Sequence, residues 1–327
     1  MQQYLSRAIK NTPKVAFTAA LVVFSGTLSS CKASTSTTNK STVNERASKN
    51  SSYPSVLDLF ACKPAEAAFV AAHRGTHEGS TFPENTTESL QALAAAKVKF
   101  AEIDVARLKD GTLILWHDGT WERGSTGKGP IAASTWADAE KLLTKDTNGN
   151  LTSIRPSKFS DALKWSKNKI YLEIDFKSSV DPKNVIQEIR DAGMIDQVIL
   201  IAYNEEQALE FHKLAPEAAL SVSTFEPGAI KAWKVKGIPT SVIAGWTGRD
   251  PITPELEAAL RKNDIPVLAA SFFSLDDKLQ KSGDFGAYVD FAKPADLVVT
   301  DYAFDAQPVL MMSDTQERQM KACLDEK

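Results

Sequence analysis

The feature that most constrains the fold is an alternation of short apolar runs with helical stretches between Ala67 and Asp301. The runs are rich in β-branched residues, and the stretches between them carry apolar residues with helical periodicity. This pattern is typical of parallel strands covered by helices. The strand candidates are Phe69–His73, Phe100–Val105, Leu113–His117, Ile170–Phe176, Val198–Tyr203, Leu220–Thr224, Ser241–Trp246, Pro266–Ser271 and Leu297–Asp301. Helices are expected at Glu88–Val98, Ser160–Ser166, Asn184–Ala192, Glu205–Leu214 and Pro254–Lys262.

These strand candidates exceed by one the strands of a (β/α)8 TIM barrel. The connection from Arg107 to Gly111 contains an Asp-Gly turn and is too short for a crossover helix, so one strand beside it is irregular or lies outside the barrel. A doubly wound open sheet is the alternative. We favour the TIM barrel because polar residues recur at the C-terminal ends of many strands, where a barrel has its single active site.

The N-terminus has the features of a secretory signal peptide. Only basic charged residues precede an apolar run from Val15 to Leu28. The run is too short to span a membrane, and small residues follow it. Two small residues separate Leu28 from Cys31, which resembles the processing site of bacterial lipoproteins, where the cysteine becomes the lipidated first residue of the mature protein. The alternative is an ordinary signal peptide in which Cys31 is incidental.

The polar stretch after Cys31 predicts a tether. Residues 32–52 are mainly Ser, Thr, Asn and Lys, so they cannot bury a core. We therefore divide the chain into a lipoprotein signal peptide at residues 1–30, a lipidated Cys31 with a flexible polar tether at 31–65, and a barrel domain at 66–327. This division predicts an exported protein that is anchored to a bacterial membrane as a lipoprotein, in the periplasm or another extracytoplasmic space.

The charge balance argues against nucleic acid as a partner. The formal net charge is -3, and removal of the basic leader makes the rest of the chain more acidic. No basic run follows the tether, and an acidic surface repels a polyanion. No second apolar stretch is long enough to span a membrane. No feature of the sequence indicates an oligomeric state.

Cys62 and Cys323 are the cysteines that remain besides Cys31. Cys62 precedes the first strand candidate, and Cys323 lies near the C-terminus. Closure of a barrel brings its first and last strands together, so the segments that flank them can meet. Export supplies oxidising conditions. We predict a disulfide between Cys62 and Cys323, with two separate thiols as the alternative.

Two of the four histidines end strand candidates. His73 is followed by Arg74 and Gly75, and His117 is followed by an aspartate. A histidine has an unperturbed pKa of about 6.5, so it can serve as acid or base at neutral pH. The alternative for each histidine is a polar residue satisfied at the rim of the barrel. Arg74 is suited to clamp a phosphate oxygen, and Gly75 permits the close backbone approach that such a clamp needs.

Glu102 and Asp104 lie two residues apart in an apolar strand candidate, and therefore on one face. Two like charges in a barrel interior are costly unless a positive charge lies between them. A hard divalent cation with oxygen ligands meets this requirement, and a partner Arg or Lys is the alternative. A second strand candidate repeats the pattern with Glu173, Asp175 and Lys177 on one face. Lys177 is suited to neutralise charge that develops on a phosphate oxygen, or it only pairs with its neighbours.

Several short motifs follow one another along the chain. They are His73-Arg74-Gly75, Pro83-Glu84-Asn85-Thr86, Glu102-Ile103-Asp104-Val105, Lys109-Asp110-Gly111 with His117-Asp118, Arg123 and Thr126 before Gly129, Ser160-Asp161-Ala162-Leu163, and Thr300-Asp301. In this order they resemble the glycerophosphodiester phosphodiesterase family over about residues 68–303. The first half of the resemblance is the more specific.

The resemblance implies a TIM barrel of the phospholipase C-like phosphodiesterase type. It implies that His73 and His117 act as general acid and base, and that Arg74 holds the phosphate. The reaction it implies is hydrolysis of glycerophosphodiesters to sn-glycerol 3-phosphate and an alcohol.

The resemblance also implies a divalent metal ion, Mg or Ca, bound by Glu102, Asp104 and one acid of the later strand. The family commonly shows an acid, one residue and a lysine there. Asp175 and Lys177 match this pattern, so we prefer Asp175 as the ligand and Lys177 as the cation on the phosphate side. Glu173 is an additional carboxylate and the fallback ligand.

Three functions remain open. The first is glycerophosphodiester hydrolysis, and the second is a lysophospholipase D or a cell-envelope phosphodiesterase that uses the same site. The third is a non-catalytic binding lipoprotein, which the retention of both histidines, the arginine and the acidic strands disfavours. The sequence after Tyr203 is less specific, so the pocket for the alcohol is less defined. Trp246 and Phe272 are candidate walls of that pocket, although buried aromatic residues more often only pack in a core.

Overall fold

The structure, a computed structural model, describes residues 53–327. The predicted signal peptide, Cys31 and most of the predicted tether lie outside these residues. Within them, no helix combines the length and the apolarity needed to cross a membrane.

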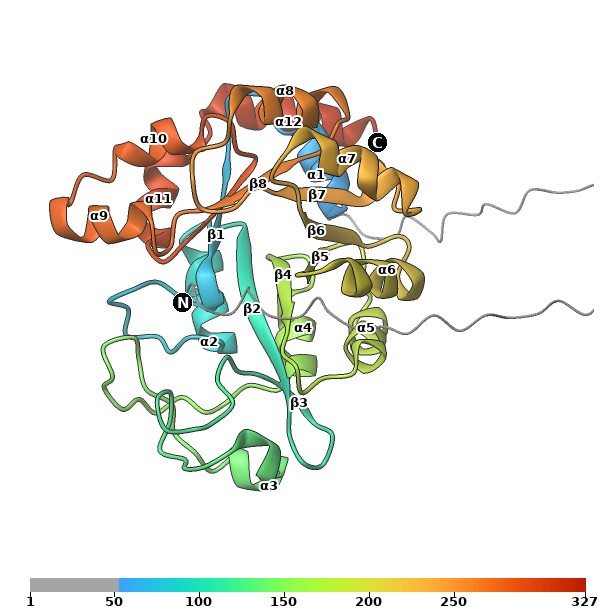
Figure 1. The fold of residues 1–327 in the computed structure, drawn as a ribbon. Helices are drawn as coiled ribbons and strands as arrows, with labels where there is room; N and C mark the ends of the chain where they lie inside the picture. The colour runs from blue at the N-terminus through green and yellow to red at the C-terminus, as the bar shows by residue number, and fades with distance from the viewer. Residues whose placement is uncertain (1–52) are drawn as a thin grey trace, which may run out of the picture. The chain divides into compact units, whose positions relative to one another are not determined.

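Parallel strands close into a barrel in the described part of the chain (Figure 1). The strands are β1 (Phe69–Ala72), β2 (Phe100–Arg107), β4 (Tyr171–Phe176), β5 (Val198–Ala202), β6 (Ala219–Ser223), β7 (Ile243–Trp246), β8 (Val267–Ala270) and β9 (Leu297–Thr300). They pair in the order β1-β9-β8-β7-β6-β5-β4-β2, and β2 pairs with β1 to complete the ring. This closure confirms the predicted TIM barrel and excludes the open sheet.

The extra strand candidate lies outside the barrel. β3 (Leu113–Leu115) runs antiparallel to β2, and the tight turn at Gly111, with φ +92°, joins the two strands. Because β3 runs back toward the C-terminal ends of the barrel strands, the residues after it return to the mouth of the barrel. There the backbone N–H of Trp116 donates to the carbonyl of Asp104 at 2.9 Å.

Helices cover the outside of the barrel, as the alternation in the sequence predicts. The expected helices form, with small shifts at their ends, and further helices join them. The helices are α1 (Val56–Cys62), α2 (Thr87–Ala95), α3 (Trp136–Ala139), α4 (Phe159–Ser166), α5 (Pro182–Asp191), α6 (Glu205–Leu214), α7 (Pro227–Val235), α8 (Pro254–Lys262), α9 (Leu275–Ser282), α10 (Ala287–Ala292), α11 (Ala303–Leu310) and α12 (Asp314–Asp325).

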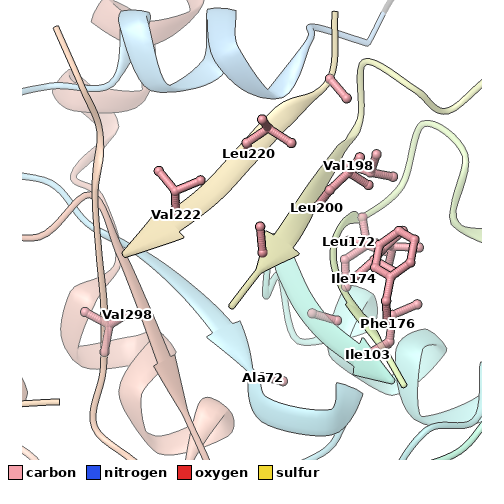
Figure 2. Close-up of a cluster of buried hydrophobic side chains, with 14 of the residues drawn as sticks. Ala72, Ile103, Leu172, Ile174, Phe176, Val198, Leu200, Leu220, Val222 and Val298 are labelled. Atoms are coloured by element: carbon pink, nitrogen blue, oxygen red, sulfur yellow. The ribbon is translucent and has the colours of Figure 1, made fainter. Parts of the chain in front are cut away.

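Each barrel strand turns one set of side chains toward the helices and the alternate set toward the barrel interior. The outward set is apolar and buried, as Figure 2 shows for Ile103 of β2, Ile174 of β4, Leu200 of β5 and Val222 of β6. Removal of this apolar surface from water is the main stabilising contribution to a fold of this kind. The inward set is free to carry polar residues at the mouth.

Aromatic side chains fill the N-terminal end of the barrel. Phe100 of β2 lies at the centre of this cluster, with its ring centroid 5.3 Å from that of Phe69 and 4.9 Å from that of Tyr171. Phe60 of α1 stacks on Phe100 at 5.6 Å. The end of the barrel opposite the polar mouth is therefore an apolar plug, and α1 is part of it.

α1 corrects the predicted boundary of the tether. Its residues Val56 and Leu59 are buried against the barrel, so residues 56–62 belong to the barrel domain although we assigned 31–65 to the tether. A helix of two turns is too short for its periodicity to be recognised in the sequence. A disulfide joins Cys62 to Cys323 of α12, and the two helices pack side by side (Figure 1). The predicted bridge is confirmed.

Candidate active site

His73 lies at the C-terminal end of the barrel. β1 ends at Ala72, and His73 begins a short 3-10 turn. Its Nδ1 atom lies 2.7 Å from Oδ1 of Asp301, the residue after β9. The imidazole also stacks on Phe272, with centroids 4.1 Å apart and planes at 9°. Because the carboxylate engages Nδ1 and Phe272 fixes the ring plane, Nε2 is the nitrogen available for chemistry.

His117 follows β3 and lines the same cavity as His73. Its Nδ1 atom lies 2.7 Å from Oδ1 of Asp118, and its Nε2 atom lies 3.1 Å from Nη2 of Arg74. A guanidinium group only donates hydrogen bonds, so Nε2 of His117 accepts and the ring proton is on Nδ1. In this arrangement the Nε2 lone pair of His117 is directed at the arginine.

Two arginines and two carboxylates form a network with His117. Arg74 donates to Oε2 of Glu84 at 3.2 Å. Arg123 donates to both oxygens of Glu84, at 2.6 and 3.0 Å, and to both oxygens of Asp118, at the same two distances. Burial alone would raise the pKa of Asp118, but hydrogen bonds from Arg123 and His117 lower it to about 2. Asp118 is therefore ionised at neutral pH and keeps the Nδ1 tautomer of His117.

Glu102, Asp104 and Asp175 form a buried acidic cluster at the mouth. β2 and β4 pair in register, so that Asp104 lies opposite Asp175 and Glu102 lies opposite Glu173. One oxygen from each residue of the cluster lies within 4.8 Å of the others, and the residues are only 7%, 1% and 5% exposed. The structure thus brings together the predicted ligands, with Asp175 rather than Glu173 as the third member.

The ammonium group of Lys177 forms ion pairs with two of these three carboxylates. Nζ of Lys177 lies 2.5 Å from Oδ1 of Asp104 and 2.6 Å from Oδ2 of Asp175. Burial alone would raise the pKa of Asp104, but the positive charge of Lys177 holds this pKa below its usual value. Burial and the nearby charges of Asp104 and Asp175 raise the pKa of Glu102 well above its usual value. The lysine partner, which was the alternative to a metal ion, leaves Glu102 without an ion pair in the described part of the chain.

The cluster fits a hard divalent cation. All of its donor atoms are carboxylate oxygens, the ligands that Mg²⁺ and Ca²⁺ prefer. The backbone N–H of Arg74 donates to Oε2 of Glu102 at 2.8 Å. Asn85 donates to Oδ2 of Asp104 at 2.6 Å and accepts from its backbone N–H at 2.9 Å. Such hydrogen bonds orient ligands from behind, and a bound cation would offset the repulsion that raises the pKa of Glu102.

Glu173 lines the same cavity but lies outside the acidic cluster. The residue is 1% exposed, and its Oε2 atom has no hydrogen-bond partner among the described residues. Burial raises the pKa of Glu173 to about 7, although a hydrogen bond with Ser221 opposes the shift. A carboxyl group with this pKa is partly protonated at neutral pH. Geometry separates Glu173 from the predicted ligands, because the oxygens that lie within 4.8 Å of one another belong to Glu102, Asp104 and Asp175.

The site residues line one cavity of about 550 Å³ at the mouth of the barrel. The histidines, Arg74, the carboxylates and Lys177 form its polar side. Aromatic side chains complete its lining and include Trp246 and Phe272, the two walls that the sequence indicated. Tyr203, Phe225 and Phe273 are 64%, 62% and 61% exposed and form an aromatic rim.

Sequence analysis did not assign roles to several residues of the site. Asp301 and Asp118 orient the histidines, Asn85 supports Asp104, and the hydroxyl of Tyr203 donates to Asp175 at 3.0 Å. Asp301 and Tyr203 were visible as polar residues at the ends of strand candidates, which is the signal that could have drawn attention to them. Their partners were not visible, because 228 residues separate Asp301 from His73.

Comparison with known proteins identifies the family. A model of the glycerophosphoryl diester phosphodiesterase family matches residues 73–325. The chain belongs to this family. A glycerophosphodiester phosphodiesterase of Caldanaerobacter subterraneus subsp. tengcongensis is 23% identical over 230 residues, which are 68% of this chain and 93% of that protein. The uncharacterized protein YqiK of Bacillus subtilis is 25% identical over 235 residues, which are 69% of this chain and 96% of that protein.

Solved structures share the barrel. A glycerophosphoryl diester phosphodiesterase from Parabacteroides distasonis superposes with a TM-score of 0.73 at 23% identity, covering 81% of this chain and 96% of that one. A phosphodiesterase from Oleispira antarctica, solved with its product sn-glycerol-3-phosphate, superposes with a TM-score of 0.58 at 20% identity, covering 78% and 99%. At these identities the likeness shows the fold.

Membership of the glycerophosphoryl diester phosphodiesterase family makes the chain an enzyme that hydrolyses phosphodiester bonds. The third function left open by the sequence, a binding lipoprotein on a non-catalytic barrel, is therefore set aside.

Proposed function

We propose that this enzyme hydrolyses glycerophosphodiesters to sn-glycerol 3-phosphate and an alcohol, with a divalent metal ion and with His73 and His117 as general acid and base. The observation that carries the proposal is the cavity itself. It joins two histidines, each with Nδ1 engaged by an aspartate, to a cluster of three buried carboxylates. The named substrate of the Caldanaerobacter relative and the product bound by the Oleispira enzyme support the substrate class.

The hydrogen bonds favour His117 as the base. Its Nε2 atom is an acceptor, because Arg74 donates to it. When Arg74 turns to a substrate phosphate, this lone pair is released to take a proton from the attacking water. The new P–O bond forms as the P–O bond to the departing alcohol breaks, and His73 gives its Nε2 proton to that oxygen. His117 gains one proton and His73 loses one, so the two histidines together carry the same number of protons before and after this step.

Arg74 and Lys177 supply positive charge for the phosphate. Arg74 lines the cavity, where its guanidinium can donate hydrogen bonds to a phosphate oxygen. Glu102, Asp104 and Asp175 would hold the metal ion, Mg or Ca, which when bound acts as a Lewis acid on a phosphate oxygen. Lys177, which pairs with two of these carboxylates, would then be available to the phosphate.

A second candidate substrate class is supported by the aromatic rim. Tyr203, Phe225 and Phe273 expose apolar surface beside the polar half of the cavity. A lysophospholipid carries a phosphodiester next to an acyl chain, so a lysophospholipase D reaction at the same site would use both halves. A phosphodiester of a cell-envelope polymer would use the polar half.

The N-terminal sequence supports an extracytoplasmic location. A signal peptide at residues 1–30 and a lipidated Cys31 would export the enzyme and anchor it to a bacterial membrane. The disulfide between Cys62 and Cys323 agrees with an oxidising compartment.

The test is product identification on a substrate panel. Purified enzyme with added Mg or Ca is incubated with glycerophosphocholine, glycerophosphoethanolamine and lysophosphatidylcholine, and the phosphorus-containing product is identified by NMR. We expect sn-glycerol 3-phosphate from the first two substrates, with isotope from labelled water on the phosphate. Release of phosphocholine instead, or no hydrolysis of any diester, would contradict the proposal. Faster release of lysophosphatidic acid from the third substrate would favour the lysophospholipase D activity.

A further inference from the structure

A buried polar network lies behind the catalytic mouth, around Asp276 of α9. Its Oδ1 atom accepts a hydrogen bond from the hydroxyl of Tyr288 at 2.6 Å. Its Oδ2 atom accepts from the hydroxyl of Thr300 at 2.9 Å and from the backbone N–H of Asp301 at 2.8 Å. Asp276 is 1% exposed, and Tyr288 and Thr300 are fully buried. The network therefore joins α9 and α10 to the end of β9, on the flank of the barrel where α10 and α11 lie side by side (Figure 1).

Burial of this network costs free energy. A buried carboxylate loses its hydration, and replacement of such a group by apolar residues is often neutral or stabilising. Burial raises the pKa of Asp276, although hydrogen bonds from Tyr288 and from the backbone N–H of Asp301 oppose the shift. A role in holding α9 to β9 alone would be met more cheaply by apolar packing. The role of Asp276 therefore lies in the groups that donate hydrogen bonds to it.

Asp276 accepts a hydrogen bond from the backbone N–H of Asp301, and the side chain of Asp301 contacts His73. The side chain of Asp301 is 29% exposed, so burial does not fix it. Its backbone is fixed from both sides, because its N–H donates to Asp276 and its carbonyl accepts from the N–H of Glu78 at 2.7 Å. Its Oδ1 atom lies 2.7 Å from Nδ1 of His73. The position of the carboxylate that orients the imidazole thus depends on a backbone anchored by Asp276.

The turn that carries Asp276 also contacts His73 directly. Between β8 and α9, residues 271–276 place Phe272 flat against the imidazole and bring Asp276 to the backbone of Asp301. The backbone N–H of Asp276 donates to the carbonyl of Ser271 at 3.0 Å, which closes the turn. One short segment therefore constrains the ring plane of His73 and, through Asp301, the direction of its Nε2 atom.

We propose that Asp276 is a positioning residue for catalysis: it anchors Asp301 and thereby fixes the orientation of His73. The proposal rests on the proposed role of His73 as a catalytic residue. Asp276 itself is not among the residues that line the cavity, and its side chain accepts hydrogen bonds from Tyr288, Thr300 and the backbone N–H of Asp301. Its removal should lower the rate of the chemical step and leave substrate binding largely intact.

The experiment compares kcat and KM for hydrolysis of glycerophosphocholine by the full enzyme and its variants. Asp276→Ala should lower kcat by about 10- to 100-fold, the range seen when supporting groups behind reactive residues are removed, with KM within about twofold. Asp276→Ala should cost nothing further in an Asp301→Ala background, because it acts through Asp301. Asp276→Asn should recover most of the activity, since an amide oxygen can still accept from the backbone N–H of Asp301.

Asp296 provides the matched control at the opposite end of the barrel. It is also buried, accepts the backbone N–H of Val267 at 2.7 Å, and pairs with Lys63 at 3.0 Å and Arg261 at 2.6 Å. Asp296→Ala should lower the melting temperature without changing kcat of the folded enzyme. A similar loss of kcat in Asp296→Ala and Asp276→Ala would show a general structural effect and overturn the proposal.

Two further outcomes decide the proposal. A folded Asp276→Ala enzyme with kcat within about twofold of wild type, or an additive loss in the double variant, would overturn it. If Asp276→Ala does not fold, Asp276→Glu takes its place. It keeps the charge but moves the carboxylate by one methylene, and unchanged kcat in that variant would equally overturn the proposal. Unchanged activity in His73→Ala would contradict the proposed function instead, which separates the two failures.

Discussion

The buried carboxylates at the two ends of the barrel differ in how far cationic partners compensate their charge. At the N-terminal end, the carboxylate of Asp296 has two cationic partners, Lys63 and Arg261, and lies beside the aromatic plug around Phe100. At the C-terminal end, Glu102, Asp104 and Asp175 crowd together with a single ammonium group among them. The first arrangement stabilises the fold, and the second is costly until a ligand adds positive charge.

Left-handed backbone occurs at both ends and does not separate them. Arg74, Asn85 and Phe273, with φ values of 55°, 55° and 58°, lie at or behind the C-terminal mouth, whereas Lys97, Asn168 and Asp264, with φ values of 63°, 59° and 54°, lie in the turns before β2, β4 and β8. The repelling charges, by contrast, gather at the mouth, where function requires them, at a cost that the rest of the fold offsets. The comparison therefore predicts that changes at the mouth remove activity, whereas changes at the plug remove stability.

The largest expected effect is the loss of either histidine. His73→Ala and His117→Ala should each lower kcat by at least about 10²- to 10⁴-fold, the contribution of a general acid or base, while the melting temperature stays near that of wild type. On a nitrophenyl phosphodiester, whose leaving group needs little protonation, His73→Ala should be partly rescued and His117→Ala should not. Steady-state kinetics of both variants on both substrates decides this. Near-normal turnover in both would make the histidines structural.

The opposite end is tested by the disulfide. A Cys62→Ser, Cys323→Ser double variant should lose about 2 to 4 kcal/mol of unfolding free energy, because the bridge closes a loop of 261 residues in the unfolded chain. Its kcat at low temperature should equal that of wild type. Urea unfolding measures the first quantity, with reduced wild-type protein as the control. A loss of kcat without a loss of stability would break the comparison.

A smaller effect of opposite sign is expected at the mouth. Glu102→Gln removes one of the crowded charges and keeps an oxygen that can accept from the backbone N–H of Arg74. In metal-free protein it should raise the unfolding free energy by about 0.5 to 2 kcal/mol, as other removals of functional strain do, while activity is lost. Chemical unfolding in the presence of a chelator measures this. A destabilised Glu102→Gln protein would show that the carboxylate contributes to the fold.

The smallest expected effect is the loss of unfolding free energy when Asp118 is protonated at low pH. The folded-state pKa of Asp118, about 2, lies below its ordinary value of 3.8, so the ionised form stabilises the fold at higher pH. This contribution is present above about pH 4 and is lost as the pH falls through about 2. Because the side chain is partly exposed, it should be less than about 1 kcal/mol. The free energies of urea unfolding of wild type and Asp118→Asn should differ at pH 5 and converge toward pH 2.

The sequence predicts the fold well where periodicity is strong. The buried strands appear because Ile103 and Ile174 alternate with acidic residues, and the turn at Gly111 marks the strand that leaves the barrel. α1 was missed because its seven residues are too few to show a period.

The acidic cluster could be predicted because its members share a face of neighbouring strands, which is a local property of the sequence. The partners of the histidines could not be predicted in the same way. The contact of His73 with Asp301 requires closure of the barrel, and the network of Asp276 requires the packing of α9 and α10 on β9. The family resemblance already favoured Asp175 over Glu173, and in the structure it is Asp175 whose side chain converges with Glu102 and Asp104.

The central claim is that the carboxylates at the mouth bind a divalent ion on which hydrolysis depends. The most direct test is to titrate metal-free enzyme with Mg²⁺, Ca²⁺ or Mn²⁺ while turnover of glycerophosphocholine is measured. We expect no turnover at the start and saturation at about one ion per chain, the stoichiometry of a single carboxylate site. Asp175→Ala should need far more metal than Glu173→Ala. Full activity after exhaustive chelation would contradict the account.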